Sequence, residues 1–129
     1  MEKIKVLVAD DVKIMRSLLR SSLASFECEI VSEVDNGDEV TEQIRHCEPD
    51  IVFLDINMPG KNGLDVLQEI KEEFSGLFVA MISGHNSFDN IKRSMELGAD
   101  GFVVKPYTSI KIREMIDKYR RGSQNSFLI

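Results

Sequence analysis

Short apolar runs alternate along the chain with longer segments in which apolar residues recur every three or four positions. The runs are rich in β-branched residues, which is typical of strands. Strands are expected at residues 4–9, 29–34, 50–54, 77–82 and 101–104. The periodic segments predict helices at residues 12–26, 38–46, 64–74, 88–97 and 109–119.

The strict alternation of strand and helix predicts a fold class. The runs at 51–54, 78–82 and 102–104 are continuously apolar, as expected where helices cover both faces of a parallel sheet. Residues 29–34 alternate more, which suits an edge strand. With right-handed crossovers, the pattern indicates a three-layer, doubly wound (βα)5 fold around a parallel five-stranded sheet. A chain of 129 residues is long enough for one such domain but short for two.

Composition and charge narrow the function classes. Apolar residues make up 43% and charged residues 29%, a balance typical of a globular protein rather than a disordered, fibrous or membrane chain. The net charge of −6 argues against a general nucleic-acid or anionic-membrane binder. We expect no signal peptide or membrane span and a cytoplasmic location. Cys28 and Cys47 form no CxxC pattern, so we expect both to be small buried hydrophobic side chains rather than a metal site or disulfide.

Polar side chains follow four of the five expected strands. In an open α/β sheet, ligands bind beyond the carboxyl ends of the strands, near the point where the strand order reverses. The strand-end residues are Asp10 and Asp11, Asp55, Ser83 and Lys105. We expect these side chains to meet at one edge of the sheet.

Three carboxylates in one pocket require a cation, because each like-charged pair repels by about 1–4 kcal/mol at a few ångströms. Lys105 supplies one positive charge, and the remaining oxygen ligands suit a hard divalent ion such as Mg²⁺. Mg²⁺ keeps several waters and commonly binds phosphate oxygens. A carboxylate can itself accept a phosphoryl group covalently, and the central Asp55 is the expected nucleophile.

In this scheme each remaining group has one task. Asp10, Asp11 and the backbone carbonyl of Asn57 would hold Mg²⁺, while Lys105 and the Ser83 hydroxyl would bind phosphoryl oxygens.

Taken singly, the same residues have simpler interpretations. Adjacent acids such as Asp10 and Asp11 often cap a helix, and Ser83 could do so too, although Ser87 is the better candidate. Asp55 could be a turn carboxylate and Lys105 a solvated lysine.

Four motifs of this sequence occur together in a known protein family. They are Asp10-Asp11, the segment Phe-Leu-Asp-Ile-Asn-Met-Pro-Gly-Lys-Asn-Gly at 53–63, Ser83-Gly84, and Gly-Ala-Asp-Gly-Phe-Val-Val-Lys-Pro at 98–106. The chain resembles the receiver domain of bacterial two-component response regulators, most of all the stand-alone chemotaxis type, from about residue 5 to 119. The resemblance implies a flavodoxin-like sheet of order 2-1-3-4-5, which chemotaxis receivers share. It places a receiver domain at 1–121 and a C-terminal tail at 122–129.

The resemblance also implies residue roles. Asp55 would accept a phosphoryl group from a histidine kinase, a phosphotransfer protein or acetyl phosphate, with Mg²⁺ bound by Asp10, Asp11, Asp55 and the Asn57 carbonyl. Lys105 would pair with the phosphate, and Lys105-Pro106 would be a cis peptide. Ser83 and Phe102 fall on the family's switch pair, although without the resemblance Phe102 would more often be core than switch. Gly84 and His85 depart from commoner residues beside Ser83.

The implied function is a signalling switch, not a classical enzyme: the domain would catalyse only its own phosphorylation and dephosphorylation. The surface of residues 88–97, 101–104 and 109–119 would meet an unknown protein partner or a second copy, without direct binding of nucleic acid or membrane.

Three other functions compete with this one. A flavin-binding electron carrier would need a phosphate loop rich in Gly, Ser and Thr after the first strand, where Asp10-Asp11 stands instead. A phosphatase of the haloacid dehalogenase type would need a carboxylate at position 57, and Asn57 cannot shuttle a proton, so hydrolysis of phospho-Asp55 should be slow. A receiver-like module that is never phosphorylated would not need the intact acidic set.

Overall fold

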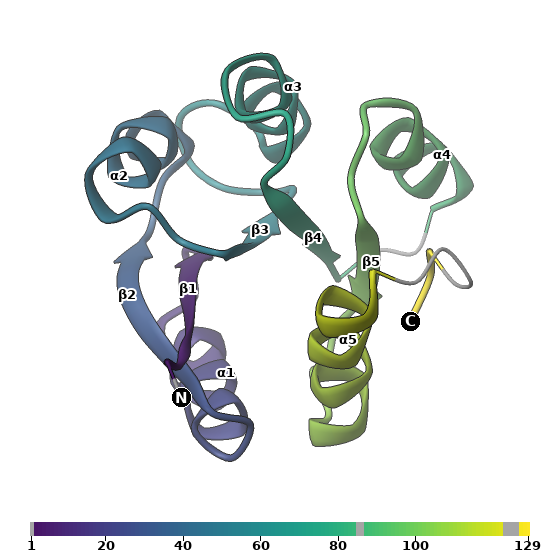
Figure 1. Cartoon of the computed structure of the whole chain (residues 1–129). Helices are drawn as coiled ribbons and strands as arrows, with labels where there is room; N and C mark the ends of the chain where they lie inside the picture. The colour runs from purple at the N-terminus through teal and green to yellow at the C-terminus, as the bar shows by residue number, and fades with distance from the viewer. Residues whose placement is uncertain (1, 85–86, 123–126) are drawn as a thin grey trace.

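The computed structural model describes residues 2–84, 87–122 and 127–129. Its centre is a sheet of five parallel strands in the order β2-β1-β3-β4-β5. The strands are β1 (Ile4–Ala9), β2 (Cys28–Val34), β3 (Ile51–Asp55), β4 (Phe78–Ser83) and β5 (Gly101–Val104). The predicted fold class and strand order are therefore confirmed, and the alternating β2 is an edge strand (Figure 1).

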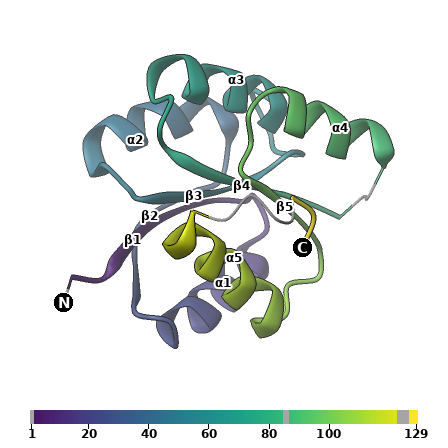
Figure 2. The same cartoon turned by 45° about the vertical axis from the view of Figure 1, so that its right-hand side comes forward.

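Five α-helices cover the two faces of the sheet. They are α1 (Lys13–Ala24), α2 (Val40–Cys47), α3 (Gly63–Glu73), α4 (Phe88–Glu96) and α5 (Ser109–Arg121), with a 3-10 turn, η1 (Gly37–Glu39), before α2. Helices α1 and α5 lie on one face, and α2, α3 and α4 lie on the other (Figure 2). The result is the three-layer arrangement that the sequence pattern predicts.

The core forms two layers because successive strand residues point to opposite faces of the sheet. Val52 and Leu54 pack under α2, α3 and α4, whereas Ile51 and Phe53 pack toward α1 and α5. All five residues of β3 are buried, which explains the unbroken apolar run at residues 51–54. The centre of the sheet is thus a rigid platform for the side chains at its carboxyl edge.

Several helix ends differ from the sequence prediction because local backbone geometry sets them. Helix α1 ends at Ala24, two residues early, since the chain turns into β2 through Glu27 in a left-handed conformation (φ 59°). The α2 region starts as a 3-10 turn because the Asn36 side chain accepts hydrogen bonds from the Asp38 and Glu39 N–H groups. Helix α5 continues to Arg121 and stops where Gly122 adopts φ 64°.

The two cysteines are free thiols. Cys28 is buried, as expected, and its burial raises the pKa of the thiol, whereas Cys47 is only half-buried. Among the described residues, no helix combines the length and apolar character needed to span a membrane.

Candidate functional site

The carboxyl edge of the sheet gathers the strand-end residues that the sequence singles out. Asp10 directly follows β1, Asp55 is the last residue of β3, Ser83 is the last of β4, and Lys105 directly follows β5. The edge lies where the strand order reverses, because β1 has β2 on one side and β3 on the other. The side chains of Asp10, Asp55 and Ser83 are buried. Groups far apart in sequence therefore meet at one site.

Three carboxylates form the acidic part of this site. One oxygen from each of Asp10, Asp11 and Asp55 lies within 4.8 Å of the other two. Asp10 and Asp55 are buried, while Asp11 is exposed and leaves the cluster open to solvent. A compact set of carboxylate oxygens without Cys or His ligands fits a hard divalent cation that keeps some of its waters.

Lys105 lies between the two buried carboxylates. Its Nζ is 2.7 Å from Asp55 Oδ2 and 3.0 Å from Asp10 Oδ2. Burial alone would lower the pKa of Lys105, but the hydrogen bonds to Asp55 and Asp10 outweigh it and raise that pKa. The ammonium therefore stays charged and partly neutralises the pocket, which still holds more negative than positive groups. The peptide bond that follows, Lys105–Pro106, is cis.

Asp55 is held by its own loop as well as by Lys105. Its Oδ1 accepts a hydrogen bond from the Asn57 N–H at 3.0 Å, and the Asn57 side chain is exposed. Burial raises the pKa of the Asp55 carboxyl above its ordinary value, although Lys105 pulls it down. The ionised form needed for a nucleophile is thus present but disfavoured by desolvation.

Gly63 lets α3 begin directly against the Asp55 loop. A Cβ at this position would lie 2.2 Å from Asp55 O and 2.6 Å from Ile56 Cα, which is too close for any side chain. The Gly63 N–H also donates to Ile56 O at 2.7 Å. The start of α3 therefore fixes the backbone that carries the candidate acceptor.

The first residues of α1 and α4 show whether Asp10 and Ser83 act as helix caps. The N-cap of α1 is Val12, which makes no side-chain cap, and Asp10 Oδ1 accepts the Val12 N–H at 2.9 Å, outside the helix. At α4, Ser87 is the N-cap, and its Oγ accepts the Asn90 N–H at 3.1 Å. Ser83 is therefore not the cap of α4, and Asp10 faces the carboxylate cluster.

Two further residues support Asp10, and the sequence reasoning missed both. The Tyr107 hydroxyl donates to Asp10 Oδ2 at 3.2 Å, and burial followed by the negative charge of Asp10 raises the pKa of this phenol. Arg16 Nη1 donates to the Asp10 carbonyl oxygen at 2.7 Å. The only sequence signal for Tyr107 is its place two residues after Lys105, at the same edge of the sheet. Arg16 has none, because it reaches back from the first turn of α1.

The predicted switch pair occupies neighbouring strands. Ser83 lies opposite Val104, and Phe102 lies opposite Met81, two positions further back along β5. Both Ser83 and Phe102 are completely buried. The Lys105 N–H donates to Ser83 O at 2.8 Å, which ties the ends of β4 and β5 together. His85, the other unusual residue near Ser83, lies outside the described residues.

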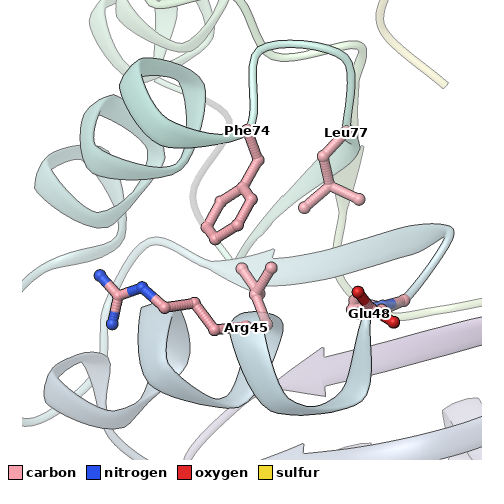
Figure 3. A pocket seen from close by; sticks show the side chains of 6 residues that line it. Arg45, Glu48, Phe74 and Leu77 are labelled. Atoms are coloured by element: carbon pink, nitrogen blue, oxygen red, sulfur yellow. The ribbon is translucent and has the colours of Figure 1, made fainter.

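A surface pocket lies away from this chemistry. It is lined by Ile44, Arg45, Glu48, Pro49, Phe74 and Leu77, where α2 and α3 end and β3 and β4 are about to begin. Figure 3 shows the Phe74 and Leu77 side chains pointing toward α2. The strands begin at this end of the sheet, whereas Asp55 lies where they end, so the pocket contributes nothing to the acidic site.

Comparison with known proteins places this fold and site in a family. The family model of the response regulator receiver domain matches residues 6–117, which is most of the chain. The chain therefore belongs to the response regulator receiver domains of two-component systems. The chemotaxis protein CheY of Halobacterium salinarum is 36% identical over 112 residues, which cover 87% of this chain and 92% of that protein. The predicted resemblance is confirmed.

Solved structures agree with this placement. The receiver domain of the putative response regulator NarL from Mycobacterium tuberculosis has a TM-score of 0.86 at 30% identity, covering 93% of this chain and 98% of that one. A chain in the CheX–CheY–BeF3–Mg²⁺ complex from Borrelia burgdorferi has a TM-score of 0.85 at 28% identity, covering 89% and 87%. The acidic cluster of this chain is thus of the kind at which receiver domains bind Mg²⁺.

Proposed function

We propose that this chain is a phosphorylatable switch in which Asp55 accepts a phosphoryl group in a Mg²⁺-dependent reaction. The observation that carries the proposal is the convergence of three carboxylates and one lysine at the reversal point of the sheet, with Lys105 Nζ 2.7 Å from Asp55 Oδ2. The donor would be a histidine kinase, a phosphotransfer protein or acetyl phosphate in the cytoplasm. The domain would promote only its own phosphorylation and dephosphorylation.

The proposed chemistry is a phosphoryl transfer to a carboxylate. An Asp55 oxygen attacks phosphorus, the bond between phosphorus and the donor's nitrogen or oxygen breaks, and the donor leaves with that electron pair. Catalysis of such a transfer depends mainly on positioning and charge neutralisation. The Asn57 N–H and the start of α3 hold Asp55 in place, and Lys105 offers an ammonium for the incoming oxygens. The buried Ser83 hydroxyl would bind another of them.

A bound Mg²⁺ would neutralise charge on the phosphoryl oxygens. Asp10, Asp11, Asp55 and the Asn57 backbone carbonyl would hold it, and the exposed Asp11 leaves a solvent-facing side for the phosphoryl group. The Tyr107 hydroxyl and the Arg16 guanidinium orient Asp10 by their hydrogen bonds to its side chain and backbone. This support belongs to the chain itself and exists before any ion binds.

The competing functions fit these residues less well. A flavin carrier would place free backbone N–H groups after β1, but here the Val12 N–H is bonded to a carboxylate that would repel a phosphate. A phosphatase would need an acid or base in place of Asn57, whose side chain is an amide. The absence of such a group favours a long-lived phosphoryl state, which suits a signal.

The signal would be passed on through the surface of α4, β5 and α5. Phe88 and Met95 of α4 and Ile110 of α5 are exposed by 76%, 53% and 62% of their surfaces. Large exposed apolar side chains on these neighbouring elements favour a protein partner or a second copy of the chain. Lys105 directly follows β5, so a change at the phosphoryl site reaches this face within a few residues.

Intact-mass spectrometry with acetyl phosphate and Mg²⁺ tests the proposal. We expect one added phosphoryl group on the wild-type chain and none on Asp55→Ala or after chelation of Mg²⁺. Asp35→Ala is a matched control, because Asp35 is exposed and outside the acidic cluster. Labelling that persists in Asp55→Ala, or never appears in the wild type, would overturn the proposal.

A further inference from the structure

The outer edge of β5 has an occupant from its own chain. Phe127–Ile129, here called the tail strand, lies beside β5 in a parallel bridge between Phe102 and Leu128. The Phe102 N–H donates to Phe127 O at 2.9 Å, and the Ile129 N–H donates to Phe102 O at 2.9 Å. Figures 1 and 2 show this end of the chain next to β5. Both outward-facing backbone groups of Phe102 are therefore bonded to the tail strand.

Two of the three tail-strand side chains anchor it. The Phe127 ring lies 6.4 Å from the Phe102 ring, and Lys118 Nζ is 5.9 Å from the Phe127 ring centre. Phe127 and Ile129 pack against the core layers on the two faces of the sheet. The Leu128 side chain is 47% exposed. The anchoring thus depends on Phe127 and Ile129, with little contribution from the Leu128 side chain.

The seat of the tail strand lies within the face proposed for partners. Phe127 lines a hollow together with Met95 of α4 and Lys118 of α5. Helix α5 ends at Arg121, and its C-cap Gly122 has a left-handed backbone (φ 64°). The tail strand pairs with β5 at Phe102 through two backbone hydrogen bonds.

We propose that the β5 edge is a strand-accepting interaction surface and that the tail strand is its resident ligand. A protein partner that adds an extended segment at Phe102 would then have to displace Phe127–Ile129. Open strand edges recruit extended segments through main-chain hydrogen bonds, with side-chain pockets giving selectivity. The segment that fits would present an aromatic residue and, two positions later, an aliphatic one, as the tail strand does. The proposal rests on the proposed function only in assigning this face to partners.

Tethering explains how so short a contact can block the edge. A segment joined to the domain competes with an effective concentration of about a millimolar, without any further contact. A partner must therefore either bind more tightly than the tail strand or present its segment at a comparable local concentration.

Hydrogen exchange at the Phe102 amide tests the docking in the full chain without any phosphoryl donor. We expect the double variant Phe127→Ala/Ile129→Ala to exchange this amide about tenfold faster than the wild type, because its acceptor is lost. Leu128→Ala is the matched control and should exchange as the wild type does. The Phe53 amide in the core should be unaffected in both variants, which shows that they fold. Equal Phe102 exchange in the wild type and the double variant would overturn the proposal.

A peptide with the sequence of residues 122–129 tests the competition in trans. Added at about millimolar concentration, it should shift the Phe102 amide resonance of the double variant but leave the wild type and Leu128→Ala unchanged. Equal binding to all three chains, or to none, would contradict a resident tail strand. Phosphorylation of the same samples by acetyl phosphate is scored separately, so a failure of the tail strand and a failure of Asp55 as acceptor are distinguishable.

Discussion

At the scale of single residues, Asp55 is under opposing influences. Burial at the carboxyl edge disfavours its charge, whereas Lys105 and the Asn57 N–H favour it. Burial prevails, so the pKa of Asp55 is raised. The folded chain therefore carries an ionised carboxylate that is less stable than the same group in water, and a bound cation would relieve that cost.

This conflict predicts the effect of neutralising Asp55 in Mg²⁺-free buffer. Asp55→Asn should raise the free energy of unfolding at pH 7, because the amide needs no buried charge. The raised folded pKa means that wild-type stability declines as pH rises from the unfolded pKa through the folded pKa. The stability advantage of Asp55→Asn over the wild type should therefore grow as the pH rises from the unfolded to the folded pKa of Asp55. It should persist at higher pH and vanish below this range.

Urea unfolding over a pH series measures this difference. Asp35→Asn, at an exposed aspartate, is the control and should show no such pH-dependent gain. If Asp55→Asn were less stable than the wild type at neutral pH, the ion pair with Lys105 would outweigh burial, and our view of the pocket would be wrong.

At the scale of elements, α4 contains a buried polar side chain whose hydrogen-bonding capacity is unmet in the described part of the chain. Ser94 is completely buried in it, and in the described part of the chain its Oγ has no hydrogen-bond partner. A buried hydroxyl without a partner costs about 1–3 kcal/mol relative to a satisfied one. The same helix exposes Phe88 and Met95. Helix α4 thus combines a buried hydroxyl without a partner with exposed apolar side chains on the proposed partner face.

Ser94→Ala should accordingly stabilise the chain. The expected gain in the free energy of unfolding is about 1 kcal/mol or more, from removal of the unsatisfied hydroxyl. Ser21→Ala on the exposed side of α1 controls for helix propensity, which alone contributes about 0.5 kcal/mol. Thermal or urea unfolding gives both values. If Ser94→Ala raised the free energy of unfolding no more than Ser21→Ala did, the Ser94 hydroxyl would either have a hydrogen-bond partner or cost no stability in the folded chain.

The elements could largely be predicted because their apolar periodicity reflects burial. The continuous runs of β3 and β4 and the three- and four-residue spacing in α1 arise from the layers they face. Their ends were less predictable, since a left-handed Glu27 or the Asn36 side chain decides where a helix stops or starts. Such local backbone choices leave no periodic trace in the sequence.

At the scale of the whole molecule, the topology of the sheet determines which side chains come together at the site. Once the sheet is parallel, the strand-end residues must share an edge, which is why Asp10, Asp55, Ser83 and Lys105 could be grouped from sequence. Contacts between side chains from unrelated elements could not be foreseen. Tyr107 reaches Asp10 across 97 positions, and the tail strand returns to Phe102 from the end of the described chain.

Chemical trapping of the phosphorylated residue tests whether Asp55 is the phosphoryl acceptor. After reaction with acetyl phosphate and Mg²⁺, borohydride reduces an aspartyl phosphate to homoserine, and peptide sequencing by mass spectrometry locates it. We expect homoserine at position 55 and at no other aspartate, with none formed when Mg²⁺ is chelated. Two results would contradict Asp55 as the phosphoryl acceptor: homoserine at position 10 or 11, or no homoserine in a phosphorylated sample that borohydride has reduced.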